Sequence, residues 1–130
     1  MGALDGVSLS LPGLIRACKL GKRASGVGFD WPDEEGVRAK ILEELAEIEE
    51  ARNDGRPDHV AEEMGDLLFA VANLARHLGV DPEDSLRAAN RKFTARFREM
   101  ERIANRQERT WDELTPAEME GLWQRVKDAE

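Results

Sequence analysis

Several residue types that build other classes of protein are scarce in this chain of 130 residues. Tyr is absent, aromatic residues make up 5% of the sequence, and Cys18 is the single cysteine. The shortage of aromatics disfavours an aromatic-rich strand protein. A single cysteine excludes an internal disulfide and fits a reducing compartment. The sequence therefore predicts a cytoplasmic protein whose fold depends on neither strands nor disulfides.

Long apolar runs are also missing. No segment approaches the roughly 18 consecutive apolar residues that a membrane span needs. The first ten residues lack the basic region and the apolar stretch of a secretory signal. The formal net charge of −8 disfavours attraction to nucleic acid or to anionic membranes. We therefore expect neither a membrane nor a nucleic acid among the partners.

Helical periodicity is the dominant pattern in the chain. Hydrophobic residues make up 41% and charged residues 35% of the sequence, as in soluble helical domains. Apolar residues recur at helical spacing in about five segments, and no segment alternates with period two for long enough to predict a strand. The expected helices are one capped by Ser10 that fades by Ser25, one from about Asp33 to Asn53, one from about Pro57 to Leu78, one opened by Asp81 and Pro82, and one that begins at Thr115.

The apolar residues of each expected helix lie on one face, as they do in a bundle. Short connections favour antiparallel neighbours. The predicted fold class is an all-α antiparallel bundle of about five helices, with one domain over residues 11–130 after an extension over residues 1–10. Its core is expected from Leu11, Leu14, Ile15, Cys18, Val37, Ile41, Leu45, Ile48, Val60, Met64, Leu67, Leu68, Val71, Leu74, Leu78, Leu86, Phe93, Phe97, Met100, Met119, Leu122 and Val126.

Carboxylates form two pairs on the second and third expected helices. Glu44 and Glu47 are one helical turn apart, and so each points from nearly the same side of its helix. Glu63 and Asp66 have the same spacing. At 100° per residue, the first pair lies about 55° and 115° from the apolar stripe of its helix, and the second lies roughly 80° and 140° from its own, in the same rotational sense. Two antiparallel helices would therefore bring all four carboxylates to one edge of the groove between them.

Four crowded carboxylates repel one another unless a cation neutralises them. Oxygen ligands select hard cations, so Mg²⁺, or Mn²⁺ as a substitute, is favoured over zinc. The alternative is a solvated acidic surface balanced by arginines, and the spacing alone does not decide between the two. Acidic side chains predominate over residues 33–66 and basic ones over residues 87–109. This suits either two attracting helices or a site for a cation together with a polyphosphate.

Two segments carry a family resemblance. EELAE, from Glu43 to Glu47, and EEMGDLLF, from Glu62 to Phe69, resemble the EExxE…ExxD signature of MazG-type nucleotide pyrophosphohydrolases. The segments KRASGVGFDW, NLARHLG, ANRKFTARFREME and LWQRVK are similar to flanking parts of the same family. The likeness is to the C-terminal catalytic domain of MazG and covers about residues 11–128. Longer members carry two such domains in tandem and this chain holds one, so its assembly and any regulation stay open.

The resemblance implies an all-α fold whose subunits associate as at least a homodimer. It implies Mg²⁺-dependent hydrolysis of a ribo- or deoxynucleoside triphosphate to the monophosphate and pyrophosphate, in a house-cleaning role in the nucleotide pool. The residues that match the family's metal ligands are Glu44, Glu47, Glu63 and Asp66, and those that match its substrate contacts are Lys40, Lys92, Arg96, Trp123 and Lys127.

Structural interpretations stand beside some of these assignments. Lys92 and Arg96 lie one turn apart, so they can grip neighbouring phosphate oxygens or can pair with Glu99 and the acidic helix. Trp123 has apolar neighbours and can equally belong to the core. His77 lacks partner ligands at metal spacing, so we interpret it as structural or exposed.

The aromatic loop and the general base also leave alternatives. Phe29 and Trp31 can stack on a base or can close the end of the bundle. Glu43 and Glu47 are alternative bases for activating the attacking water. The main rival from another class of function is a non-catalytic helical module that binds a protein partner. The four carboxylates combined with basic residues argue against that module, because a scaffold has no need of all of them together.

Overall fold

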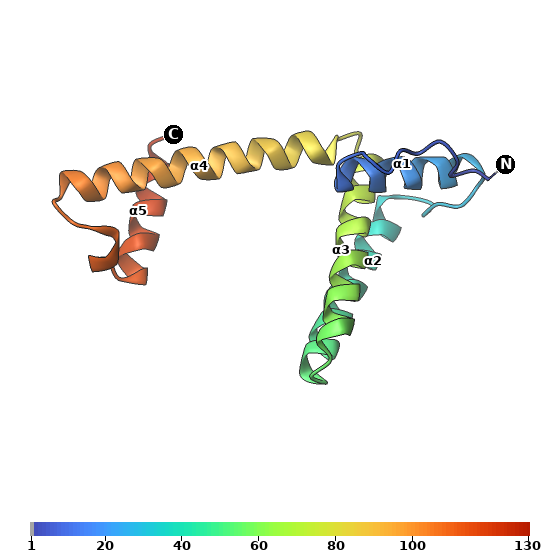
Figure 1. The fold of residues 1–130 in the computed structure, drawn as a ribbon, viewed down its shortest axis with the longest axis horizontal. Coiled ribbons are helices and arrows are strands. Elements are labelled where there is room, and N and C mark those ends of the chain that lie inside the picture. The colour runs from blue at the N-terminus through green and yellow to red at the C-terminus, as the bar shows by residue number, and fades with distance from the viewer. Residues whose placement is uncertain (1) are drawn as a thin grey trace. The chain divides into compact units, whose positions relative to one another are not determined.

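The computed structural model describes residues 2–130, and over that range the chain is helical without a strand (Figure 1). The chain divides into unit 1, which ends at Ser85, and unit 2, Leu86–Glu130. None of the described helices is long and apolar enough to cross a membrane. The elements are α1 (Gly13–Gly26), α2 (Glu34–Asn53), α3 (Pro57–His77), α4 (Pro82–Arg106), the 3₁₀ turn η1 (Trp111–Glu113) and α5 (Pro116–Asp128).

Local sequence signals set most of the helix ends. Asp33 caps α2, because its side chain accepts a hydrogen bond from the Gly36 N–H at 2.9 Å. Thr115 opens α5 through a reciprocal capping box with Glu118, as the sequence predicted. Gly79 follows the end of α3 with a φ of +72°, a conformation that glycine adopts without strain.

The start of α1 differs from the prediction, and the Ser10 cap was wrong. Pro12 takes the N-cap position, and no side chain caps the helix. The carbonyl of Pro12 accepts the first helical hydrogen bond from the Arg16 N–H at 2.9 Å. The Ser10 hydroxyl lies 2.7 Å from that of Ser8, so it is used within the preceding turns. Residues 2–10 of the predicted extension form no helix, and residue 1 lies outside the described range.

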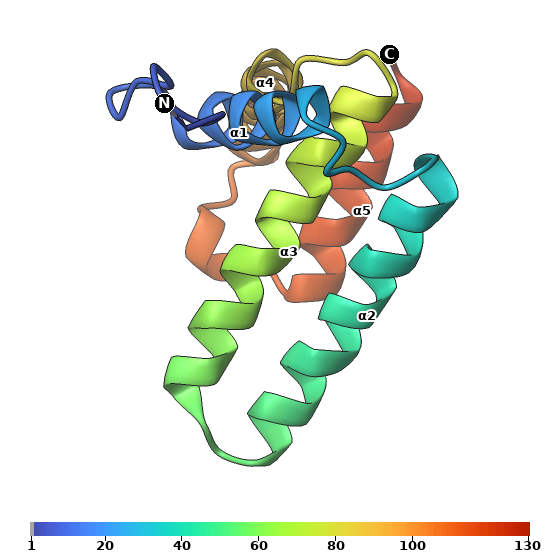
Figure 2. The ribbon, with the colours of Figure 1, turned by 90° about the vertical axis from the view of Figure 1, so that its right-hand side faces the viewer.

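Unit 1 is built on an antiparallel pair, α2 and α3, with α1 packed on the C-terminal part of α3 (Figure 2). The buried positions of α3 are small or polar: Ala70, Ala72 and Asn73. Gly21 is the buried residue of α1. Small residues on both helices let their backbones approach closely, and this approach orients the polar groups described below.

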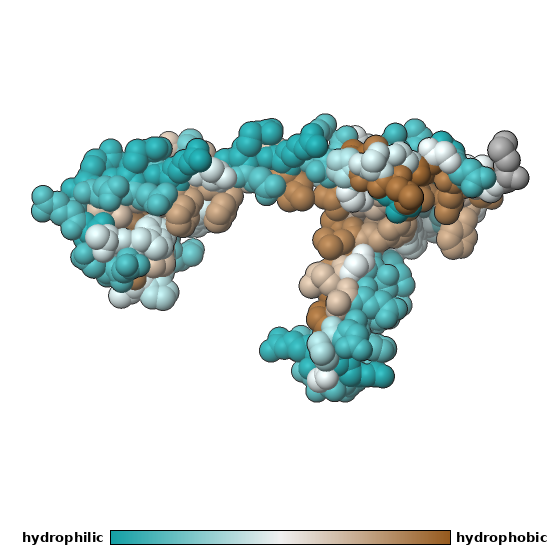
Figure 3. All heavy atoms as spheres, in the orientation of Figure 1, coloured by the Kyte–Doolittle hydropathy of each residue, from teal (hydrophilic) through white to brown (hydrophobic). Residues whose placement is uncertain are grey.

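Part of the predicted core is exposed, so the predicted stripe of α3 was wrong as a buried face. Met64, Leu68 and Val71 are 42%, 51% and 43% exposed, because the face of α3 that meets α1 carries the small residues instead. Figure 3 shows brown, apolar spheres along the surface of the α2 and α3 column. The predicted core residues that are exposed are Leu45, Met64, Leu68, Val71, Leu78, Leu86 and Phe93.

Unit 2 has a core of its own, formed by the C-terminal half of α4 with η1 and α5. Phe97 of α4 packs against Trp111 of η1 with ring centroids 4.8 Å apart. The predicted apolar stripe of α4 ended at Met100, and η1 was not predicted. The prediction therefore missed Ile103 and Ala104, which lie one turn further along α4. The core residues are Met100, Ile103, Ala104, Leu114, Leu122 and Val126, with Phe97, Trp111, Met119 and Trp123 packed against them.

Candidate functional site

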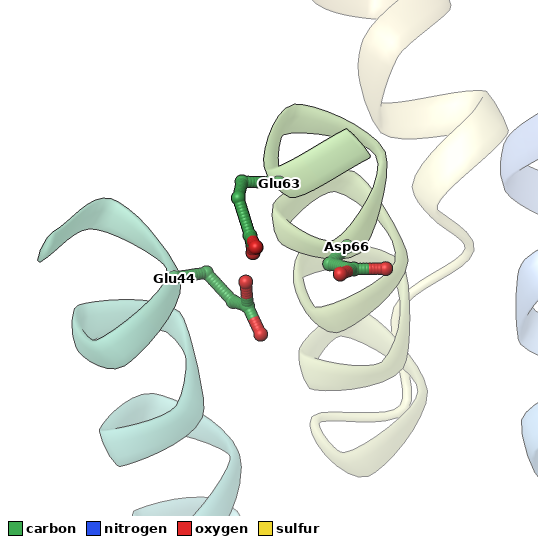
Figure 4. A group of neighbouring side chains, drawn as sticks. All are labelled: Glu44, Glu63 and Asp66. Atoms are coloured by element: carbon green, nitrogen blue, oxygen red, sulfur yellow. The ribbon is translucent and has the colours of Figure 1, made fainter. Parts of the chain in front are cut away.

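Three carboxylates of unit 1 meet between α2 and α3. Glu44 extends from α2 towards Glu63 on α3, and Asp66 lies one turn further along α3 (Figure 4). One carboxylate oxygen from each of the three residues lies within 4.8 Å of the others. Within residues 2–130, this is the one group of at least three His, Cys, Asp or Glu side chains close enough to share a metal ion. Antiparallel packing of the two helices brings together three of the four carboxylates that the helical spacing placed at one edge of the groove, without Glu47.

The cluster leaves carboxylate oxygens without partners. Glu44 is 2% exposed. Its Oε2 atom and that of Glu63 are buried, and neither has a hydrogen-bond partner among the described residues 2–130. A buried oxygen without a donor is destabilising, and more so when it is charged. The chemistry of this donor set, carboxylate oxygens only, fits a hard divalent cation.

The crowding shows in the proton affinities of the two glutamates. The pKa of Glu63 is raised to about 7, first because its protonated carboxyl can donate to Glu44, then because it can donate to Glu47, and further because of burial. Burial acts to raise the pKa of Glu44, but hydrogen bonding from Glu63 and from Lys40 outweighs it, so that pKa is lowered. A site that holds a proton between carboxylates at neutral pH is one that a divalent cation can occupy in the proton's place.

The remaining predicted residues of α2 lie at the edge of the cluster. Lys40 Nζ lies 3.0 Å from Glu44 Oε1 and 3.6 Å from Glu43 Oε1, so this lysine already neutralises one side of the cluster. Glu43 is exposed, and its recorded partner is Lys40. Glu47 lies near enough to Glu63 to raise its pKa but is not one of the three residues of the tight group.

Phe29 and Trp31 lie in the loop between α1 and α2, beside an apolar pocket of about 520 Å³ in unit 1. The side chain of Phe29 is 81% exposed, so it does not plug the end of a bundle in this unit. The pocket takes in Phe69 of α3 on another side. Its lining is apolar apart from two residues that carry charge, Asp30 and Arg76.

These two charged residues belong to a polar network that the sequence did not reveal. Arg76 donates to Asp30 from both terminal nitrogens, at 2.9 and 2.8 Å, and His77 Nε2 lies 3.0 Å from the same carboxylate. The hydrogen bond from Arg76 is the main reason that the pKa of Asp30 lies well below its usual range. The signal that could have pointed to this network is Asn73, a polar residue between small apolar ones on α3.

The predicted phosphate contacts gather in unit 2. Arg96 donates from Nε and Nη2 to the two carboxylate oxygens of Glu130, each at 2.7 Å, and its guanidinium carbon lies 5.3 Å from the centre of the Trp123 ring. Hydrogen bonding from Arg96 is the main cause that lowers the pKa of Glu130, and the charges of Lys92 and Lys127 lower it further. Three cations of unit 2 therefore act on one carboxylate.

The fold and the carboxylate group together define an all-α protein with a candidate site for a hard divalent cation. Comparison with known proteins narrows this class. Residues 29–93, half of the chain, match the family model described as phosphoribosyl-ATP pyrophosphohydrolase. A phosphoribosyl-ATP pyrophosphatase of Methylococcus capsulatus is 41% identical over 57 residues, which cover 44% of this chain and 54% of that protein.

Two further relatives cover nearly the whole chain. The nucleoside triphosphate pyrophosphohydrolase/pyrophosphatase MazG of Thermotoga maritima is 44% identical over 117 residues, 90% of this chain and 45% of that protein. A nucleoside triphosphate pyrophosphohydrolase of Escherichia coli K12 is 45% identical over 130 residues, 98% of this chain and 49% of that protein. The chain therefore belongs to the MazG-type pyrophosphohydrolase family, and it spans about half the length of these two relatives.

Proposed function

We propose that the chain hydrolyses a ribo- or deoxynucleoside triphosphate to the monophosphate and pyrophosphate, with Mg²⁺ as its cation and Mn²⁺ as a substitute. The observation that carries this proposal is the group formed by Glu44, Glu63 and Asp66, in which the buried Oε2 atoms of Glu44 and Glu63 lack partners within residues 2–130. The names of the two long relatives support the same reaction. We further propose a house-cleaning role in the cytoplasmic nucleotide pool.

The carboxylates hold the cation in this proposal. Glu44, Glu63 and Asp66 supply the tight group, and Glu47 completes the set from one turn along α2. The cation would offset the negative charge of the triphosphate and help to bring water and phosphorus together. Lys40, already 3.0 Å from Glu44, keeps that carboxylate ionised and so ready to act as a ligand.

Within unit 2, we propose that a group of basic residues contacts phosphate. Lys92, Arg96 and Lys127 already bring positive charge to a single carboxylate, Glu130, and a triphosphate offers the same oxygen chemistry with more charge. Trp123 supports the arginine through its ring face. Phosphoryl and nucleotidyl transfer depend on positioning and on charge neutralisation, which is what such a group of cations provides.

The base of the nucleotide fits the apolar pocket of unit 1. Phe29 and Trp31 give it aromatic surface, and Phe69 adds a third ring from α3. Aromatic side chains bind bases by offset stacking and by burial of apolar surface. The pocket volume of about 520 Å³ lies within the size of ordinary small-ligand sites.

A homodimer is the proposed assembly. Large apolar side chains on α2 and α3 are half exposed in one chain, among them Leu45, Met64 and Leu68. Apolar surface of this kind marks interaction sites, and a second copy of the same chain is the commonest partner. Sedimentation equilibrium tests this assembly. A Leu68→Glu variant should dissociate a dimer, and a wild type that sediments as a monomer contradicts it.

Water must lose a proton as it attacks, and Glu43 and Glu47 remain alternative bases. Glu43 is exposed and paired with Lys40, whereas Glu47 lies beside Glu63. Hydrolysis in ¹⁸O-labelled water shows which phosphorus is attacked. The label enters the monophosphate if water attacks the α phosphorus, and the pyrophosphate if it attacks the β phosphorus. A Glu43→Gln variant that loses turnover while retaining Mg²⁺ affinity identifies Glu43 as the base, and one that keeps turnover leaves Glu47.

The central test measures pyrophosphate release from a panel of nucleoside triphosphates with Mg²⁺. The variants Glu44→Ala, Glu63→Ala and Asp66→Ala should each lose most of the activity and should bind Mg²⁺ more weakly in calorimetry. Glu49→Gln, an exposed carboxylate on the same helix as Glu44, is the matched control and should keep both. Activity near that of the wild type in all three folded variants would refute the metal assignment. A wild type that hydrolyses no nucleotide would favour the non-catalytic interaction module.

A further inference from the structure

The loop between α1 and α2 carries aromatic side chains but has few backbone hydrogen bonds of its own. The Phe29 N–H donates to the Ala24 carbonyl at 3.0 Å, at the end of α1. The Trp31 N–H donates to the side chain of Asp30 at 2.8 Å, and Asp33 then caps α2. Between the two helices, the loop is therefore attached to the rest of unit 1 through side chains, and Asp30 is the residue at its centre.

Asp30 is attached to the last turn of α3. Arg76 makes a two-pronged contact with it, and His77 adds a third contact to the same carboxylate. The three side chains are only 19%, 16% and 13% exposed. A paired Arg–carboxylate contact that is largely screened from water has a fixed geometry, which an exposed ion pair lacks.

Arg76 is in turn fixed to the interior of unit 1. Its Nε donates to Asn73 Oδ1 at 2.9 Å, and Asn73 is fully buried. The amide nitrogen of Asn73 donates to the Phe69 carbonyl at 3.0 Å. Gly21 of α1 makes room for this amide, because a Cβ at Gly21 would lie 1.8 Å from Asn73 Oδ1. A continuous set of hydrogen bonds therefore runs from the α1–α3 contact to the loop.

We propose that Asp30 and Arg76 are positioning residues, which hold the loop of Phe29 and Trp31 as a fixed aromatic wall of the pocket and thereby set the affinity for a ligand with a planar ring, the nucleotide base. This inference rests on the proposed function. Both residues line the same pocket as the aromatic side chains, so the anchor and the wall share one site. Their own hydrogen-bonding groups point largely at each other and at Asn73, which suits support of the loop.

The expected effect follows from preorganisation. A loop that is already ordered loses little conformational entropy when the base binds, whereas a loosened loop has to be ordered at that moment. Loss of the anchor should therefore raise KM for the nucleotide by about tenfold. The value of kcat at saturating nucleotide should change less than about twofold, because the carboxylate group on α2 and α3 is not part of the network.

The experiment compares Asp30→Asn, Arg76→Lys and their combination in the full chain. Arg76→Lys keeps the charge but loses the two-pronged geometry. Glu99→Gln is the control, because it breaks an arginine pair on α4 that lines none of the described pockets. Steady-state kinetics give KM and kcat, and hydrogen–deuterium exchange by mass spectrometry reports the amides of residues 27–33 without nucleotide.

The inference is supported if both single variants raise KM and speed the exchange of residues 27–33, while Glu99→Gln changes neither quantity. The increases in KM should not add up in the double variant, because both substitutions break the same contact. Unchanged KM in an active, folded Asp30→Asn protein overturns the inference and leaves the proposed function standing. A raised KM with unchanged loop exchange also overturns it, since Asp30 would then touch the substrate itself. If the wild type releases no pyrophosphate, the proposed function fails, and exchange alone decides whether the pair holds the loop.

Discussion

Unit 1 holds carboxylates in two different settings: Asp30, in the loop between α1 and α2, and the group of Glu44, Glu63 and Asp66 on α2 and α3. Asp30 is surrounded by donors from its own chain: both terminal nitrogens of Arg76 and the ring of His77. Glu44 and Glu63 are also buried in part, yet each keeps an oxygen without a partner within residues 2–130. The carboxylate of Asp30 is fully paired within the fold, whereas the group on α2 and α3 keeps oxygens available to a cation.

The difference is one of charge compensation. At Asp30, the chain neutralises a largely buried carboxylate with the guanidinium of Arg76. Where carboxylates instead face one another, their repulsion destabilises the fold unless a proton or a cation lies between them. Lys40 offsets only one oxygen of Glu44, so the group remains short of positive charge. Supplying or removing cations in each group therefore tests the comparison.

The largest effect is expected from placing a lysine within the group of Glu44, Glu63 and Asp66. In Asp66→Lys, the new ammonium on the exposed third position can reach Glu63 and satisfy its free oxygen. We expect a higher melting temperature without divalent ions, loss of the Mg²⁺-induced increase in that temperature, and loss of pyrophosphate release by at least roughly 10³-fold. Calorimetry with and without Mg²⁺ and a pyrophosphate assay measure these three quantities.

The control for this variant is Glu49→Lys, which makes the same change of charge at an exposed position of α2. It should keep the activity and the Mg²⁺ response. An Asp66→Lys protein that still gains stability from Mg²⁺ and still releases pyrophosphate would show that the acidic group is an ordinary charged surface.

The second effect is a loss of stability and concerns the hydrogen-bonded network of Asp30, Arg76 and Asn73. In Gly21→Ala, the added methyl would meet Asn73 Oδ1 at 1.8 Å and Arg76 Nε at 3.1 Å, so it would displace the buried amide that supports the arginine. Overpacking and a broken buried hydrogen bond together should lower the free energy of unfolding by about 2–4 kcal/mol. Urea denaturation followed by circular dichroism measures it.

Gly121→Ala is the matched control, because this glycine lies inside α5 and a Cβ there meets nothing within 4 Å. Alanine is the better helix former, so this variant should gain about 0.5–1 kcal/mol. Equal losses at both glycines would mean that the close approach of α1 to Asn73 is unimportant.

Much of the helical architecture was readable from the sequence, since it depends on local patterns. The expected helices occur, Asp33 and Thr115 cap two of them, and the spacing of Glu44, Glu63 and Asp66 correctly placed these three on facing sides of α2 and α3. Helical geometry alone decides where a residue points, so a carboxylate group made from regular helices can be predicted once the helices are known to pack as an antiparallel pair.

The hydrogen-bonded network of Asp30, Arg76 and Asn73 could not be predicted in the same way. Asp30 lies in a loop, and its partner Arg76 is 46 positions further along the chain. Their meeting depends on Gly21 letting α1 approach α3, which no local pattern announces. The same contact explains the wrong core face of α3: large apolar residues defined the predicted stripe, but small residues and Asn73 define the buried one. That Glu47 is a fourth metal ligand stays a prediction, because this residue is not one of the three in the tight group.

The third effect is a pH dependence of stability. The pKa of Asp30 is held well below its ordinary value of 3.8, mainly by the hydrogen bond from Arg76. A carboxylate with a lowered pKa stabilises the fold above its unfolded pKa, and this stabilisation is lost as the pH falls towards the folded pKa. At pH 7, Asp30→Asn should therefore unfold more easily than the wild type, by about 2 kcal/mol.

The gap between the two proteins should shrink as the pH falls below the ordinary pKa of 3.8. Urea midpoints at a series of pH values measure it. A gap that is the same at pH 3 as at pH 7 would show that Asp30 acts through packing and not through its charge.

The smallest effect concerns Glu130, a carboxylate that has an arginine partner, as Asp30 does, but is more exposed to water. Glu130 is satisfied by Arg96, yet its side chain is 49% exposed, so water and dissolved anions can compete for the arginine. If this carboxylate occupies a phosphate position, Glu130→Gln should bind pyrophosphate and nucleotide about two- to threefold more tightly, because an exposed ion pair competes only weakly. Isothermal titration with pyrophosphate in low salt measures the change. Adding Arg96→Gln to Glu130→Gln should abolish this gain in affinity, because Glu130 and pyrophosphate compete for Arg96. Tighter binding that persists without Arg96 would show that pyrophosphate binds elsewhere.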